Sequence, residues 1–166
     1  MKKLTNILLL LLITPAIVFG GDILAKTLAA DYVVNNDASL NQTDLQVTVA
    51  TAGTYDVKIS VHTASDVKAL RMMLTQGSAT IDSFILQYTC SDAWDSSINF
   101  AARRYVAPGP VSLPTAMDGR EVFCQISGSV EFSSTGTFIL SACQNWPDMS
   151  DTTMYKGSSM VLIQTD

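Results

Sequence analysis

Apolar and polar residues alternate most regularly between residues 121 and 132. Every second residue from Val122 to Phe132 is apolar or glycine, and the residues between them are polar except Phe123. Successive side chains of an extended strand point to opposite faces, so this period of two predicts a half-buried strand of about eleven residues. We expect its even-numbered residues to face a core and Glu131 to face solvent.

The segment that follows predicts a hairpin. Ser133-Ser134-Thr135-Gly136 is a cluster of turn-forming residues, and a second strand is expected at 137–143. If Phe132 faces Thr137 across this turn, the two strands lie side by side in one sheet. A final apolar strand is expected at 160–163.

Shorter alternating segments fill the rest of the chain. The clearest of them is 55–63, and further strands are expected at 31–34, 45–49, 69–76 and 83–91. Turn residues separate these segments, and none has a convincing helical period, although 69–76 is also compatible with a helical turn. Seven or eight short strands of this kind predict an antiparallel β-sandwich or barrel. The residues expected in or near its core are Val57, Ile59, Val61, Val122, Ile126, Val130, Phe132, Phe138 and Leu140.

The first twenty residues resemble a secretory signal peptide. Met1-Lys2-Lys3 is basic, residues 7–13 are apolar, and small residues precede a cut before Gly21. A retained hydrophobic anchor is the alternative, although Pro15 interrupts the apolar stretch, which is near the lower limit of the ~20 residues needed to span a bilayer. We therefore expect export, with membrane contact only if this segment is retained.

The charge balance argues against a nucleic-acid partner. The chain carries 10 Lys and Arg against 15 Asp and Glu, a net charge of −5, and its only internal basic doublet is Arg103-Arg104. Binding to a phosphate backbone requires clusters of cations. The chain beyond the leader is long enough for one domain with its own core. We expect an N-terminal arm and first strand over 21–43 and a single sandwich domain over 44–166.

The chain has three cysteines, so at least one stays unpaired within the chain. In the expected hairpin Cys124 and Cys143 share a face, directly opposite or diagonal depending on the turn, and we expect this pair to form a disulfide in an exported protein. Three buried thiols, with Cys90 as the third, remain the alternative. No Cys-x-x-Cys or Cys/His spacing predicts a zinc site.

Acidic and aromatic residues gather in two expected loops. One group consists of Asp92, Trp94 and Asp95, and the other of Trp146, Asp148 and Asp151. These are candidate ligand-binding loops, since paired carboxylates suit calcium and aromatic rings beside them suit a carbohydrate. The alternative is that these loops bind no ligand. Their carboxylates would then be solvated charges, and their aromatic residues would cap the ends of the sandwich. We expect no bound metal.

The chain offers little catalytic chemistry. His62 is the only histidine, and it shares the polar face of its strand with Ser60. A serine beside a histidine suits nucleophilic catalysis, but no serine lies in a nucleophile motif such as Gly-x-Ser-x-Gly. We therefore expect neither enzymatic activity nor a cofactor.

Short motifs in the C-terminal half follow one another in a characteristic order. They are Gly128 within one strand, Gly136-Thr137 opening the next, Ala142 and Gln144 at its end, and Gly157-Ser158 before the last strand. With the segment 44–55, they resemble TNF/C1q-like jelly-roll domains, and most of all those of bacteriophage structural proteins. The resemblance covers roughly residues 26–164 and implies an antiparallel jelly-roll sandwich that assembles as a trimer. No collagen-like Gly-X-Y repeat accompanies it.

The resemblance also carries the functional hypothesis. Phe123 and Ile139 point away from the expected core face and are the candidate residues of an apolar trimer interface. We expect a non-enzymatic structural or attachment protein on a virion surface or an exported assembly, with other virion or surface proteins as partners. The alternative is a secreted or surface-anchored bacterial binding module, with carbohydrate such as a cell-surface glycan as a candidate ligand.

Overall fold

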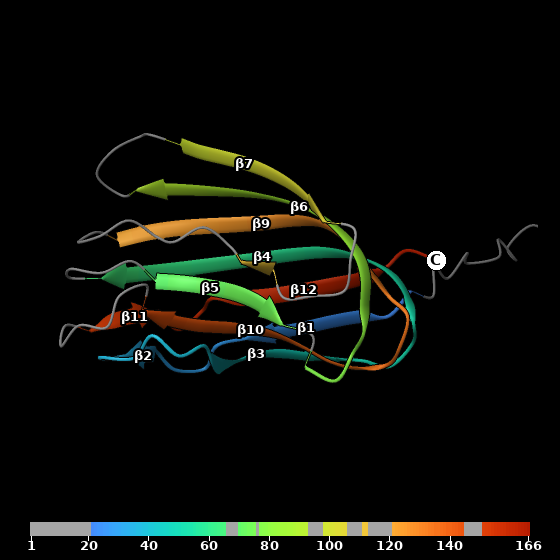
Figure 1. Cartoon of the computed structure of the whole chain (residues 1–166), viewed down its shortest axis with the longest axis horizontal. Helices are drawn as coiled ribbons and strands as arrows, with labels where there is room; N and C mark the ends of the chain where they lie inside the picture. Colours follow the sequence, from blue (N-terminus) through green and yellow to red (C-terminus); the bar gives the residue numbers. More distant parts are fainter. Residues whose placement is uncertain are drawn as a thin grey trace, which may run out of the picture.

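The computed structural model describes residues 21–65, 70–75, 77–92, 98–105, 111–112, 121–144 and 151–166. Within these ranges the chain forms β-strands and no helix (Figure 1). The strands are β1 (Ile23–Thr27), β2 (Tyr32–Val34), β3 (Asn41–Val49), β4 (Gly53–Ser65), β5 (Leu70–Thr75), β6 (Ile81–Asp92), β7 (Ile98–Tyr105), β8 (Val111–Ser112), β9 (Glu121–Phe132), β10 (Gly136–Gln144), β11 (Thr152–Met154) and β12 (Ser159–Gln164). The all-β prediction is confirmed. The pattern of the sequence did not mark β1, β7, β8 or β11.

The N-terminal leader lies outside the described residues, so the predicted signal peptide or anchor over 1–20 stays a prediction. In the part of the chain that is described, no helix has the length and apolar character needed to cross a membrane.

The strands form two antiparallel sheets whose pairing defines a jelly roll. The larger sheet has the order β1-β12-β4-β9-β6-β7, with β11 also beside β4 and β2 beside β11, and the smaller sheet has the order β3-β10-β5-β8 (Figure 1). Strands β3 to β10 pair from the outside inwards: β3 with β10, β4 with β9, β5 with β8 and β6 with β7. This is one long antiparallel hairpin rolled into two sheets, as in a jelly roll, and the predicted fold class is confirmed.

The core lies between the two sheets and follows the predicted alternation. All nine residues expected there are buried. Tyr55 and Phe132 of the larger sheet contact each other edge to face, with ring centroids 5.6 Å apart. Phe132 makes a similar contact, at 5.3 Å, with Phe138 of the smaller sheet. Aromatic packing therefore joins the sheets at this end of the core.

The predicted hairpin of β9 and β10 is wrong. β9 pairs with β4 and β6 in the larger sheet, whereas β10 pairs with β3 and β5 in the smaller one. The connection over 133–135 passes between the sheets, where the Ser133 amide donates to the Thr80 carbonyl (3.0 Å) and the Ser133 hydroxyl to the Asp82 carboxylate (2.6 Å). The alternation of apolar and polar residues determines which face of a strand is buried. It does not determine which strand lies beside it.

The first described strand is part of the larger sheet. β1 pairs along its whole length with β12, from Ile23 opposite Ile163 to Thr27 opposite Ser159, and β12 pairs in turn with β4. The boundary expected between residues 43 and 44 falls inside β3. The first strand of the chain therefore widens the sheet that carries the candidate site.

Candidate functional site

The structure describes little of the two predicted ligand loops. Four of their six residues lie outside the described ranges: Trp94, Asp95, Trp146 and Asp148. Asp92 is the last residue of β6, and Asp151 accepts a hydrogen bond of 2.8 Å from the side-chain amide of Asn35. Among the described residues, no three His, Cys, Asp or Glu side chains are grouped to hold a metal ion.

The disulfide joins Cys90 to Cys124, which corrects the predicted pairing of Cys124 with Cys143. Cys90 in β6 and Cys124 in β9 stand directly opposite each other, with their Cα atoms 4.1 Å apart. Cys143 is a buried free thiol in the other sheet, and its burial raises its pKa against the opposing effect of Arg71. The predicted pair depended on a hairpin that does not form.

Of the two candidate interface residues, only Phe123 is exposed. Its exposed fraction is 42 %, whereas that of Ile139 is 2 %. β10 is buried on both faces: Phe138 and Leu140 face the core, and Ile139 and Cys143, on the opposite face, are buried as well. Ile139 is therefore not a candidate for an exposed interface.

Exposed apolar side chains gather on the outer face of the larger sheet. In the described part of the chain, this face carries four of the five exposed large apolar residues, namely Ile23, Ile85, Phe123 and Ile163. Three of them belong to one row across the sheet, in which Ile23 pairs with Ile163, Ile163 with Asp56, Asp56 with Ser129, and Ser129 with Ile85. Residues directly opposite each other share a face. The row thus has an apolar pair at the β1 edge and a third isoleucine beyond two polar residues.

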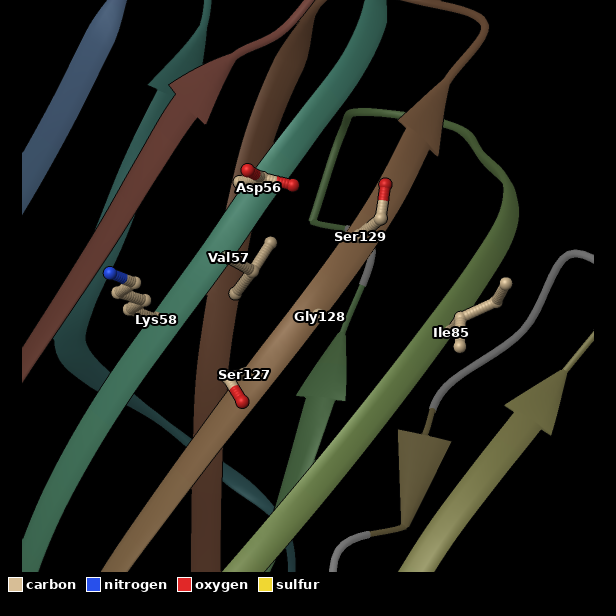
Figure 2. A pocket seen from close by; sticks show the side chains of 7 residues that line it. All are labelled: Asp56, Val57, Lys58, Ile85, Ser127, Gly128 and Ser129. Carbon is tan, nitrogen blue, oxygen red and sulfur yellow. The ribbon is translucent and has the colours of Figure 1, made fainter.

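A shallow groove follows the seam between β4 and β9 on the same face. It begins at a hollow of about 410 Å³ whose lining includes Asp56, Lys58, Ile85, Ser127 and Ser129. Figure 2 shows Asp56 and Lys58 on one side of this hollow and Ile85 on the other, with Ser127, Gly128 and Ser129 of β9 between them.

Two further hollows continue the groove along the strands. The second, of about 290 Å³, shares Lys58 and Ser127 with the first and adds Ser60 and Gln125. The third, of about 320 Å³, shares Ser60 with the second and is also lined by His62, Phe123, Lys156, Gly157 and Ser158. Because neighbouring hollows share residues, they follow one another along β4 and β9, and together they are called the groove. From Ser129 to Phe123 it follows β9 for about 20 Å at ~3.4 Å per residue.

Gly128 forms the floor of the first hollow. Its φ is +153°, and a Cβ atom at this position would overlap the carbonyl oxygen of Ile85. Only glycine lets β9 pass this close to β6 in that conformation.

His62 organises the far end of the groove. Its Nε2 atom lies 2.7 Å from the Glu121 carboxylate, and its ring centroid lies 4.7 Å from that of Tyr155. Its backbone amide donates to the Ser158 hydroxyl (3.1 Å), and its carbonyl accepts from the Tyr155 amide (2.8 Å). These contacts hold the turn before β12 against β4, beside the exposed ring of Phe123 in the third hollow.

The sequence pattern did not indicate this groove. Ser60 and Ser127 stand on the polar faces of strands that are far apart in the sequence, and only the pairing of β4 with β9 places them side by side. One local signal was present, because Gly128 interrupts the apolar positions of β9.

Comparisons with known proteins give weak structural likeness and no sequence relative. No family model matches the chain, and no curated protein matches it. The structure of the Eiger TNF from S. frugiperda is similar with a TM-score of 0.44 and 12% identity, over 88% of this chain and 93% of that chain. A structure of infectious bursal disease virus, Gx strain, is similar with a TM-score of 0.19 and 12% identity, over 86% of this chain and 40% of that chain. The jelly-roll assignment therefore rests on the strand pairing.

Proposed function

We propose that this chain is a non-enzymatic structural or attachment protein that works as a homotrimer on a virion surface or an exported assembly. The observation that carries the proposal is the apolar pair at the β1 edge of the larger sheet. Ile23 is 69 % exposed and Ile163 37 % exposed, and the two stand directly opposite each other. Exposed apolar residues that lie together commonly mark a contact between proteins.

The edge strand itself supports a subunit contact here. Among the described strands β1 pairs only with β12, so no described strand pairs with the backbone amides and carbonyls on its other side. Such an edge is a site of unwanted pairing unless another chain or element covers it. A neighbouring subunit would cover both this edge and the apolar pair. We therefore assign the trimer contact to Ile23 and Ile163, in place of Phe123 and Ile139.

Sedimentation and light scattering test this proposal. The wild-type protein should be a trimer at micromolar concentration, with an interface that buries well over ~1,200 Å² in total. Ile163→Glu should release folded monomers, because it places a charge in the apolar contact. Ile85→Glu is the matched control, since Ile85 is 58 % exposed on the same face but lies away from the β1 edge. A monomeric wild-type protein would refute the trimer.

An exported binding module that acts as a monomer is the second candidate. The groove along β4 and β9 favours it, because a module of this kind needs a ligand surface but no subunit contact. The same sizing experiment separates the two candidates.

A further inference from the structure

We propose that the groove along β4 and β9 binds a linear oligosaccharide that carries carboxylate groups. The inference names the ligand of the proposed attachment role and rests on that role, but it does not depend on the number of subunits. The shape, the lining and the charge of the groove support it.

The position of the groove determines how a ligand is recognised there. It runs over the face of the sheet between two central strands, and the backbones of β4 and β9 are paired with their neighbours on both sides. An extended peptide that gains affinity by joining a sheet needs a free strand edge, which this groove does not offer. A ligand must therefore be recognised by side chains along an open channel about 20 Å long, a length that suits a short linear oligomer.

The lining suits the chemistry of a sugar. Hydroxyl groups of Ser60, Ser127 and Ser129 and the amide of Gln125 are spaced along the channel, where they can donate to and accept from sugar hydroxyls. Within the described part of the chain, no hydrogen bond engages the side chains of Ser60, Ser127 and Gln125. The exposed ring of Phe123 at one end offers an apolar surface for the C–H face of a sugar ring. These polar groups would set the orientation of a sugar, as the polar groups of ligand sites commonly do.

The charges indicate an acidic ligand. The chain has a net charge of −5, yet two of the three lysines in its described part, Lys58 and Lys156, line the groove. No ion pair engages either ammonium group within the described residues. Among the described residues of the lining, Asp56 carries the only other charge without an ion-pair partner, because His62 contacts Glu121. Two ammonium groups along one channel suit carboxylates, to which they donate charge-assisted hydrogen bonds.

Titration calorimetry with the full-length protein and defined oligosaccharides tests the inference. The probes are tetrasaccharides of galacturonic acid, of alternating uronic acid and amino sugar, and of sialic acid. The methyl-esterified galacturonate tetrasaccharide is the matched control, since it keeps the sugar chain and removes the charge. We expect at least one acidic probe to bind, and its methyl ester to bind at least about tenfold more weakly, the loss expected for one charge-assisted hydrogen bond.

Variants place the binding in the groove. Lys58→Ala and Phe123→Ala should each weaken binding of the acidic probe up to about tenfold. Ser127→Trp should abolish binding by filling the channel where two hollows meet. Lys26→Ala is the matched control for Lys58→Ala, because Lys26 is the described lysine that lies outside the groove, in β1. Thr48→Trp is the matched control for Ser127→Trp, because it adds an exposed indole to the other sheet. Both should bind like the wild type, and melting curves establish that each variant is folded.

Several results would overturn the inference. One is that no acidic tetrasaccharide binds at millimolar concentration. Another is that a probe and its methyl ester bind equally well. A third is that both Lys58→Ala and Phe123→Ala bind the acidic probe like the wild type. Equal or tighter binding of a tetraglutamate peptide at the same residues would also overturn it, because the ligand would then be an acidic peptide. A monomer that binds the acidic probe would refute the trimer and leave the groove assignment standing.

Discussion

The substitution Gly128→Ala tests the close passage of β9 beside β6. Gly128 is opposite Leu86 of β6 and Val57 of β4, so both neighbouring strands restrict its movement. Its φ of +153° is a conformation that alanine rarely adopts, and the added Cβ would overlap the carbonyl oxygen of Ile85. The strands must separate or β9 must change conformation to admit the methyl group.

Both effects contribute to the expected loss of stability. A non-glycine residue in this region of backbone conformation costs about 1–3 kcal/mol. Forcing an extra methyl group into a packed region costs a further ~1–3 kcal/mol. The sum is centred on about 4 kcal/mol, a large part of the ~5–15 kcal/mol by which a typical domain is stable. At ~2–4 °C per kcal/mol for a domain of this size, the melting temperature should fall by about 8–16 °C.

Thermal melting followed by circular dichroism measures the effect, and Gly157→Ala is the matched control. Gly157 has a φ of +90°, but a Cβ atom there would meet nothing within 4 Å. The control therefore carries the conformational cost alone, about 1–3 kcal/mol. Equal shifts in melting temperature for the two variants, or a Gly128→Ala protein as stable as the wild type, would refute the close passage of β9 and β6.

Two further predictions concern the register of β9 and the disulfide. Ile126→Asp should unfold the domain, because an unpaired carboxylate on the core side of β9 typically costs several kcal/mol, whereas Glu131→Ser on the outer face should change the free energy of unfolding by no more than ~0.5 kcal/mol. Equal melting shifts for these two variants would contradict the register of the strand. In the native protein no thiol should react at neutral pH, because Cys143 is buried with a raised pKa and Cys90 is bonded to Cys124. Unfolding should expose one thiol without reductant and all three with it, and any other count would contradict the disulfide.

The sequence by itself determined which residues of each strand face the core. The alternation in β9 and β4 places Ile126 and Ile59 inside, and both are buried. It also placed Phe123 on the opposite face, where its ring is exposed. This information is local, because the side chains of one extended strand alternate whichever strand lies beside it. The absence of a helical period was enough to predict a structure made of strands.

Only the tertiary structure decided which strands are neighbours, and the candidate site follows from that choice. The turn over 133–135 reads as a hairpin, but hydrogen bonds to Thr80 and Asp82 hold it as a crossing between the sheets. That crossing separates Cys124 from Cys143. The pairing of β4 with β9 then forms the groove from residues that are distant in the sequence. The sequence of a strand with two apolar faces, such as β10, does not indicate which residues pack on its second face. The neighbouring strands and the residues that bury this face are determined by contacts across the whole chain.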